Sequence, residues 1–161
     1  MFNEVSTEIQ LDEVEALAVE IWNEHYVPII GKKQVDYMLE KFQSKPVMKE
    51  QISKGYIYFL VEDDSRKIGY IGLEPKEDEL FLSKLYIKAC ERGKGYGKKA
   101  VQFLEGLAKE KKLNKISLTV NKNNVKSIAA YEKIGFKNMG AIVMDIGGGF
   151  VMDDYKMEKH L

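Results

Sequence analysis

The chain has 161 residues, 45% of them hydrophobic, and its 25 basic side chains balance 25 acidic ones. This length and composition predict a single globular domain over residues 1–161, and the neutral charge argues against a general nucleic-acid binder, which usually presents a strongly basic face. One cysteine excludes an intramolecular disulfide. The sequence shows neither a signal peptide nor an apolar run of about 18 residues, so we expect a cytoplasmic protein that does not contact membranes.

The first third of the chain is predicted to be largely helical. A short strand over residues 2–6 precedes a helix over residues 12–26, which Pro28 ends. Apolar side chains in that helix recur with a period of about 3.6 residues, at Val14, Leu17, Ala18, Ile21 and Trp22. Two further helices are expected over residues 33–43 and 47–54.

The middle of the chain then changes to a strand pattern. Residues 56–61, 68–73 and 80–87 are rich in strand formers and are separated by short turns, so they predict an antiparallel meander. A helix over residues 96–112 leads to another strand at residues 116–120. A right-handed crossover through that helix would place this strand parallel to residues 80–87.

The last part of the chain combines a short helix with a hairpin. Asn124 is expected to cap a helix over residues 125–134, and residues 137–146 and 150–157 would pair around three glycines. The predicted fold class is therefore α/β, with a mixed, mostly antiparallel sheet and helices on both faces.

The most informative stretch joins the strand ending at Ile87 to the following helix, and it reads Arg-Gly-Lys-Gly-Tyr-Gly-Lys over residues 92–98. Glycine lets the backbone approach a ligand closely, and the first N–H groups of a helix lack intrahelical partners. The helix dipole adds partial positive charge at the same point, and Arg92, Lys94 and Lys98 add cations. The stretch therefore predicts a phosphate or pyrophosphate site.

The spacing of these glycines disfavours two common phosphate sites. A dinucleotide fingerprint would need glycine at position 98, which is Lys98, and a P-loop would need Ser or Thr at position 99, which is Lys99. A nucleotide-binding domain such as a kinase is therefore disfavoured. Arg92, Gly95 and Gly97 leave the pattern R-x-x-G-x-G.

Two motifs together resemble the GCN5-related N-acetyltransferase (GNAT) family. One is R-x-x-G-x-G after a strand, and the other is N-x-x-x-x-x-x-Y-E-K-x-G-F, which runs from Asn124 through Tyr131 to Phe136. The resemblance covers residues 56–159. It implies the acyl-CoA N-acyltransferase fold and the transfer of an acetyl group from acetyl-CoA to a primary amine, without a metal.

The resemblance also implies roles for individual residues. The backbone of residues 85–87 would pair with the pantetheine arm where the strand bulges and splays, and an N–H there would polarise the thioester carbonyl. Tyr131 would act as the general acid that protonates the leaving sulfur, and Asn124 would lie near the cofactor. The expected cofactor-binding residues are Leu85, Tyr86, Ile87, Arg92, Gly93, Lys94, Gly95, Tyr96, Gly97, Lys98 and Asn124.

The sequence departs from the family pattern at the general base. Several members carry a glutamate on the strand before the glycine loop, whereas residues 81–84 here are Phe-Leu-Ser-Lys. The base is therefore unassigned, with Glu74, Glu79, His25, Asp153 and a water chain as candidates. Positioning of the two substrates alone could also suffice.

The acceptor is expected to be a small cationic amine. Trp22, His25 and Tyr26 cluster at the end of the first long helix and, with Asp153 on the last strand, would bind it, although core packing explains the aromatic rings equally well. Residues 21–29 and 37–42 also resemble the PaiA-type branch of polyamine acetyltransferases.

Several alternatives remain open at this stage. The acceptor could instead be a protein or peptide amino terminus, or the chain could be a non-catalytic acyl-CoA-binding sensor. Dimers are frequent in the family, and the terminal hairpin is a plausible contact for a homodimer. Neither His25 nor His160 has the spacing of a metal ligand, so no metal site is expected.

Overall fold

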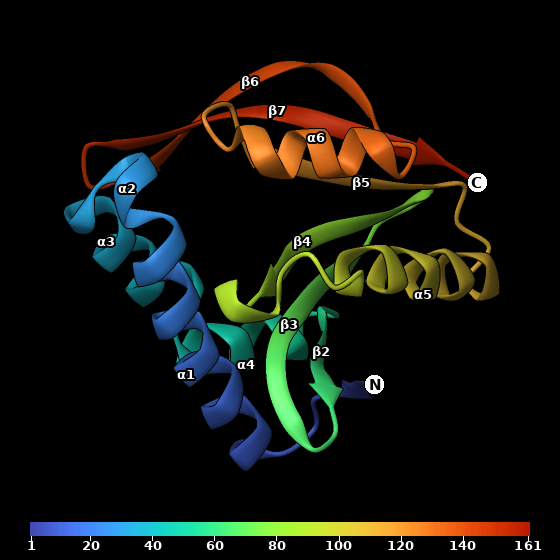
Figure 1. Ribbon diagram of the computed structural model, residues 1–161, viewed down its shortest axis with the longest axis horizontal. Helices are drawn as coiled ribbons and strands as arrows, with labels where there is room; N and C mark the ends of the chain where they lie inside the picture. Colours follow the sequence, from blue (N-terminus) through green and yellow to red (C-terminus); the bar gives the residue numbers. More distant parts are fainter.

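The computed structural model describes residues 1–161 and contains one seven-stranded sheet of order β1-β2-β3-β4-β5-β7-β6 (Figure 1). All neighbouring strands are antiparallel except the β4–β5 pair. The strands are β1 (Phe2–Glu4), β2 (Ile57–Asp63), β3 (Arg66–Pro75), β4 (Glu79–Ile87), β5 (Lys115–Asn121), β6 (Lys137–Gly147) and β7 (Phe150–His160). The predicted mixed, mostly antiparallel sheet is confirmed, including the β2-β3-β4 meander and the parallel crossover.

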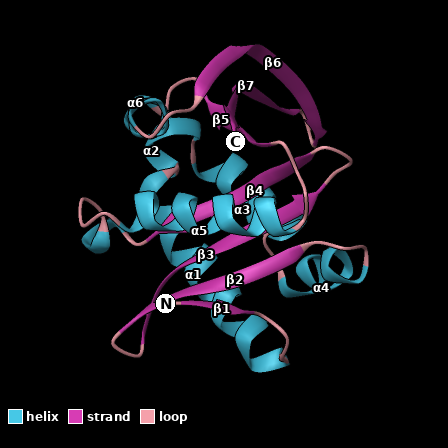
Figure 2. Cartoon of the chain, turned by 90° about the vertical axis from the view of Figure 1, so that its right-hand side faces the viewer, coloured by secondary structure: helices cyan, strands magenta, loops and turns pink.

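Helices cover both faces of the sheet, as predicted (Figure 2). The first four pack on one face, and α5 and α6 pack on the other. They are α1 (Glu8–His25), α2 (Val27–Ile30), α3 (Lys32–Phe42), α4 (Lys45–Ser53), the 3₁₀ turn η1 (Ala89–Glu91), α5 (Tyr96–Glu110) and α6 (Val125–Lys133). None of them is both long enough and apolar enough to cross a membrane.

The first helix starts earlier than its apolar pattern predicted. Thr7 and Gln10 form a reciprocal capping box, in which the Thr7 hydroxyl accepts from the Gln10 N–H at 3.2 Å and the Gln10 side chain accepts from the Thr7 N–H at 3.0 Å. These bonds satisfy helix N–H groups that otherwise have no partner. The helix therefore begins at Glu8 rather than at residue 12.

The first helix ends at His25, before Pro28, as predicted, but a second short helix, which the sequence reasoning missed, follows directly. Pro28 lies in the first turn of the short helix α2. Proline is tolerated there because its missing N–H would have no intrahelical partner in any case. The chain thus turns a corner at Tyr26 and continues as a helix.

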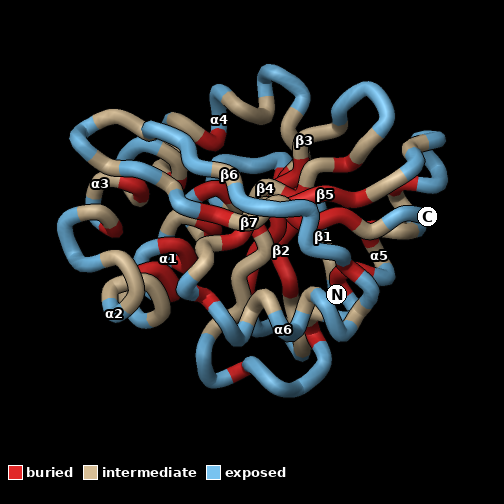
Figure 3. The backbone as a smooth tube through the Cα atoms, turned by 90° about the horizontal axis from the view of Figure 1, so that it is seen from above, coloured by how far each residue is buried: buried red, intermediate tan, exposed pale blue.

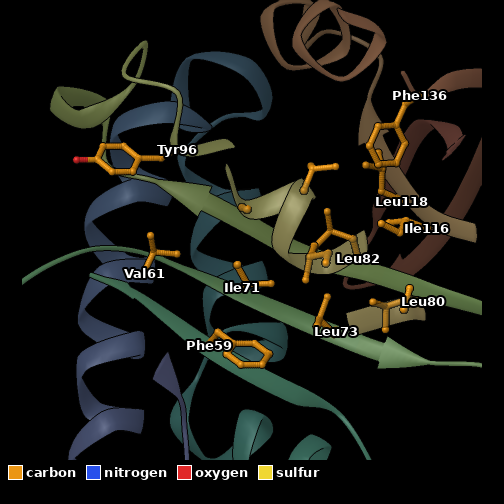
Figure 4. Packing of buried hydrophobic residues seen from close by; sticks show 14 of the residues in the cluster. Phe59, Val61, Ile71, Leu73, Leu80, Leu82, Tyr96, Ile116, Leu118 and Phe136 are labelled. Carbon is orange, nitrogen blue, oxygen red and sulfur yellow. The ribbon is translucent and has the colours of Figure 1, made fainter. Parts of the chain in front are cut away.

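Two hydrophobic cores lie on opposite faces of the sheet because successive side chains of a strand point to opposite sides. In β2, Tyr58 and Leu60 belong to the core under α1, α3 and α4, whereas Phe59 and Val61 belong to the core under α5. Figure 4 shows the second of these cores, with Phe59 and its neighbours between the strands and α5.

A β-bulge at Ser83 reverses this alternation halfway along β4. Gly72 of β3 pairs with Lys84 and Leu73 pairs with Leu82, which leaves Ser83 without a partner. Before the bulge Leu82 faces the α5 core, and after it Leu85 does so. An extra residue bends a strand and increases its twist, so the bulge turns Lys84 toward the α1 side.

The bulge buries a lysine without a carboxylate partner. Lys84 is 4% exposed, and its ammonium donates to the Phe42 carbonyl at 2.5 Å and to the Tyr58 hydroxyl. Burial lowers the pKa of Lys84 to about 7 because a charge is costly to desolvate.

This burial predicts that stability rises with pH. Below about pH 7 the Lys84 amine is charged in both the folded and the unfolded chain, and the cost of burying this charge opposes folding. Above about pH 7 the folded chain loses the proton, whereas the unfolded chain keeps it up to about pH 10.5, so folding becomes more favourable. Between pH 7 and 9 the wild type should gain about 2 kcal/mol relative to Lys84→Met. Urea unfolding at several pH values measures this difference, and Lys33→Met, an exposed lysine, is the control. A constant difference across pH would contradict the prediction.

Candidate active site

Strands β4 and β5 diverge and open a wedge in the middle of the sheet. They pair only where Glu79–Phe81 meets Lys115–Ser117. Beyond that point β5 still pairs with β7 as far as Asn121, and β4 still pairs with β3 as far as Ile87. The two halves of the sheet therefore separate toward the glycine loop, as Figure 1 shows. The bulge and splay that the resemblance implied are present.

A cavity of about 1230 Å³ occupies this wedge. Its walls come from the end of α1, the second half of β4, the start of α5, β5, α6 and β7. At one end Tyr37 and Gln34 of α3 bind the β6–β7 hairpin, donating to the carbonyls of Ile146 at 2.7 Å and Val151 at 3.0 Å. The cavity thus lies between parts of the chain that are far apart in sequence.

The glycine loop presents bare backbone to this cavity. Gly93 and Gly95 have φ of 77° and 86°, a backbone conformation that residues with a Cβ rarely adopt. A Cβ placed on Gly93, Gly95 or Gly97 would meet no other atom within 4 Å. The loop therefore leaves open space in front of the α5 N-terminus, where N–H groups have no helical partner.

A buried ion-pair cluster, which sequence reasoning missed, anchors this loop. Glu91 is 4% exposed and accepts from Arg66 at 2.5 Å and Lys94 at 3.0 Å. Both cations, Lys94 first, lower the pKa of Glu91. The Tyr96 hydroxyl also donates to Asp63 at 2.5 Å. Lys94 therefore points to Glu91 and does not line the cavity, whereas the other predicted loop residues do.

Arg92 connects the loop region to the end of α1. Its Nε donates to the Ile87 carbonyl at 3.1 Å, and its Nη1 lies 3.0 Å from Nδ1 of His25. Because arginine only donates, His25 Nδ1 is the acceptor and the imidazole proton is on Nε2. Burial, followed by the charge of Arg92, lowers the pKa of His25, and the Asn124 amide opposes the shift.

Asn124 occupies the N-cap position of α6, as predicted, but its side chain makes no capping bond. The residue is 3% exposed and lines the cavity next to His25 and Tyr26. The amide lies instead close enough to His25 and Tyr26 at the end of α1 to affect the pKa of both side chains.

Tyr131 lies on α6 and lines the cavity opposite β4. Its ring packs edge-on against Phe136 with a centroid distance of 5.4 Å. Burial, with a smaller contribution from Tyr26, raises the pKa of Tyr131 well above its usual value. The hydroxyl therefore keeps its proton at neutral pH, as a general acid must.

Aromatic rings from the end of α1 and from β4 line another part of the cavity. Tyr86 of β4 contacts Trp22 and Tyr26 edge-on, with centroid distances of 5.3 and 6.0 Å. The Trp22 indole donates to the hydroxyl of buried Tyr70 at 3.2 Å, so its ring belongs partly to the core. Burial raises the pKa of Tyr26 to about 12. The structure thus brings together Trp22, Tyr26 and His25, as the sequence suggested.

The structure does not bring Asp153 to this cluster. Asp153 is exposed and pairs with Lys122 at 2.7 Å, whereas its neighbour Asp154 is 2% exposed and lines the cavity. Of the other candidate bases, Glu74 and Glu79 also lie outside it. Adjacent residues of a strand point to opposite faces, and only the sheet register shows which of the two aspartates faces inward.

The sequence model of the acetyltransferase (GNAT) family matches residues 16–136. The chain belongs to this family. A spermine/spermidine N(1)-acetyltransferase of Bacillus subtilis (strain 168) is 29% identical over 134 residues, which cover 76% of this chain and 84% of that protein. The resemblance found in the sequence is thereby confirmed, and the chain is an acetyl-CoA-dependent N-acetyltransferase.

Solved structures share the whole fold. PaiA N-acetyltransferase from Thermoplasma acidophilum, solved with coenzyme A, has a TM-score of 0.81 at 24% identity and covers 100% of this chain and 99% of its own. A ribosomal-protein-alanine N-acetyltransferase from Brucella melitensis has a TM-score of 0.68 at 22% identity, with coverage of 100% and 99%. At these identities both likenesses establish the fold and leave the acceptor open.

The residues present fit acetyl-CoA. The open glycine backbone at the α5 N-terminus suits a pyrophosphate, and the part of β4 that has left β5 offers main-chain groups to an extended amide-rich arm.

The Glu91 cluster predicts an effect on cofactor binding. Glu91→Gln should remove the charge that holds Arg66 and Lys94, loosen the glycine loop and weaken coenzyme A binding about tenfold, with a lower Tm. Isothermal titration calorimetry and thermal unfolding measure the two effects. Glu77→Gln, an exposed acid in the β3–β4 turn, is the matched control. Unchanged coenzyme A affinity in Glu91→Gln would show that the loop does not need this anchor.

Proposed function

We propose that the protein acetylates a primary amine of a small polyamine-like acceptor by direct transfer from acetyl-CoA. The observation that carries this proposal is the single cavity, which joins the bare glycine loop, Tyr131 and an end lined by aromatic rings and a buried carboxylate. Such a cavity can hold both substrates in one line, and positioning of this kind supplies much of the rate of a bimolecular reaction.

In this proposal the glycine loop holds the pyrophosphate through backbone N–H groups at residues 93–98, with Arg92 and Lys98 nearby. The backbone of Leu85–Ile87 holds the pantetheine arm and polarises the thioester carbonyl through an N–H. When bound, acetyl-CoA supplies the acetyl group as a reactive thioester. The separation of β4 from β5 supports these assignments because it leaves that strand edge free.

Tyr131 acts as the general acid in this proposal. Its hydroxyl gives a proton to the sulfur as the carbon–sulfur bond breaks. Its place in the cavity and its raised pKa support the role, because the group is protonated whenever the substrates bind.

The acceptor is proposed from the chemistry of the aromatic part of the cavity. Rings of Trp22, Tyr26 and Tyr86 with the carboxylate of Asp154 suit an alkyl ammonium, which is attracted to aromatic faces and to negative charge. The name of the Bacillus subtilis relative, a spermine/spermidine N(1)-acetyltransferase, points to the same class of acceptor.

Replacement of Tyr131 tests the mechanism. Tyr131→Phe should lower kcat with spermidine by about 10²- to 10⁴-fold, because the leaving sulfur loses its proton donor. The dissociation constant of acetyl-CoA should stay within about twofold of wild type, since the ring is retained. Release of the coenzyme A thiol measures turnover, and Tyr155→Phe, outside the cavity, is the control. Full activity of Tyr131→Phe would remove this residue from the mechanism.

The same thiol-release assay, run on the wild type with a panel of simple amines, polyamines and peptides, decides between acceptor classes. Thiol release with peptides but not with amines would favour a protein or peptide amino terminus instead. The family match favours an enzyme over the non-catalytic sensor. Action in the cytoplasm remains a prediction.

We also propose that the protein forms a homodimer through β6. This strand is an edge of the sheet and is mostly exposed (Figure 3). Its apolar side chains include Met139 and Val143, which are 56% and 62% exposed. Unpaired apolar edges tend to pair with another strand. Lys137 and Asp145 lie at equal separations in sequence on the two sides of Ala141. If the β6 strands of two copies pair antiparallel with Ala141 at the centre, Lys137 of one copy therefore lies opposite Asp145 of the other. This self-complementary charge pattern favours a second copy as the occupant.

A charge on this edge should abolish the dimer. Val143→Lys should elute as a monomer where the wild type elutes as a dimer, because two lysines would be desolvated at the centre of the interface. Light scattering coupled to size-exclusion chromatography measures the mass. Val19→Lys, an exposed valine on α1, is the control. A monomeric wild type would rule out the interface.

A further inference from the structure

Asp154 differs from every other acid that lines the cavity. Glu91 and Glu105 each accept from a lysine or an arginine, but Asp154 makes no salt bridge although it is 2% exposed. A buried carboxylate without a cation is costly, and such a group in a cleft is a candidate for a functional site.

The position of Asp154 fits a role in the reaction. It lies on β7 opposite Asn121, where β5 has already separated from β4, and it lines the same cavity as Tyr131. His25, the other titratable candidate there, already accepts from Arg92 at Nδ1 and so has no free basic nitrogen.

We propose that Asp154 binds the ammonium of the acceptor and takes its proton, which supplies the general base that the sequence left unassigned. This inference rests on the proposed function, because it requires an amine acceptor in the cavity. The ligand class is a primary alkyl ammonium, and the aromatic rings of α1 and β4 would surround its chain.

The proton steps balance with Tyr131 as the acid. Asp154 takes one proton from the ammonium, and the freed nitrogen lone pair forms a bond to the thioester carbonyl carbon. Tyr131 gives its proton to the departing sulfur and regains one from the newly acylated nitrogen. Asp154 then releases its proton to solvent, so that one proton is released per turnover.

The charges around Asp154 suit this task. Burial first, then the charge of Asp153, raises the pKa of Asp154 to about 6, while the Thr119 hydroxyl and Lys122 oppose the shift. The charge of Asp154 also contributes to the raised pKa of Tyr26, at the end of α1. The carboxyl is therefore ionised at neutral pH but is a stronger base than an exposed aspartate.

The isosteric variant Asp154→Asn tests the proposal. With spermidine it should lose about 100-fold or more in kcat/KM, and the rise of kcat/KM through about pH 6 should disappear. Calorimetry should show acetyl-CoA binding unchanged, which demonstrates an intact fold. Asp64→Asn, an exposed turn residue, should behave as wild type. Wild-type activity and pH profile in Asp154→Asn would overturn the proposal and leave the proposed function standing.

A second measurement uses the wild-type protein and does not depend on the folding of a variant. In a ¹³C carboxyl NMR titration of the coenzyme A complex, saturating spermidine should lower the pKa of Asp154 by at least one unit, because its cation faces the carboxylate. An unmoved pKa with spermidine bound would overturn the role of Asp154. A wild-type protein that neither binds nor acetylates spermidine would overturn the proposed function as well.

Discussion

The rest of this structure depends on which neighbouring strands pair with the edges of β4 and β5. Each strand can pair with one neighbour on each edge, and β5 stays bound to β7 along its whole length while β4 stays bound to β3. The bulge at Ser83 bends β4 away after three paired residues. The sheet therefore opens without losing either half. The cavity, the free strand edge and the approach to the glycine loop all follow from that separation.

Buried charges in this structure are accommodated in three different ways. Where the backbone must be rigid, buried charges are paired, as Glu91 is with Arg66 and Lys94 under the glycine loop. Asp154, for which we propose the ammonium of the acceptor as a partner, is buried without a salt bridge. Lys84 shows a third solution, in which burial lowers the pKa until the amine can be neutral. Burying a charge costs free energy in each of these cases, and each site compensates for that cost by a different means.

The end of α1 links the parts of the cavity in which we propose that the cofactor and the acceptor bind. Arg92 follows β4 and binds His25 of α1, and Asn124 of the α6 cap lies beside the same imidazole. Three segments far apart in sequence therefore meet where the two substrates would meet. The aromatic rings of Trp22 and Tyr86 line the cavity and also belong to the core under α1, so the proposed acceptor site is built on a packed surface.

The sequence by itself determined the elements that depend on local pattern. The helical period from Val14 to Trp22, the glycine loop before Tyr96 and the spacing from Asn124 to Tyr131 each specify a local conformation, and together they led to the family and the fold class. Only the tertiary structure decided which aspartate faces the cavity, because Asp153 and Asp154 are adjacent on one strand and a shift of one residue exchanges their faces. Long-range pairing also decided that Glu91 anchors the loop and that a bulge buries Lys84, since Arg66 and Phe42, which bind these two side chains, come from distant segments.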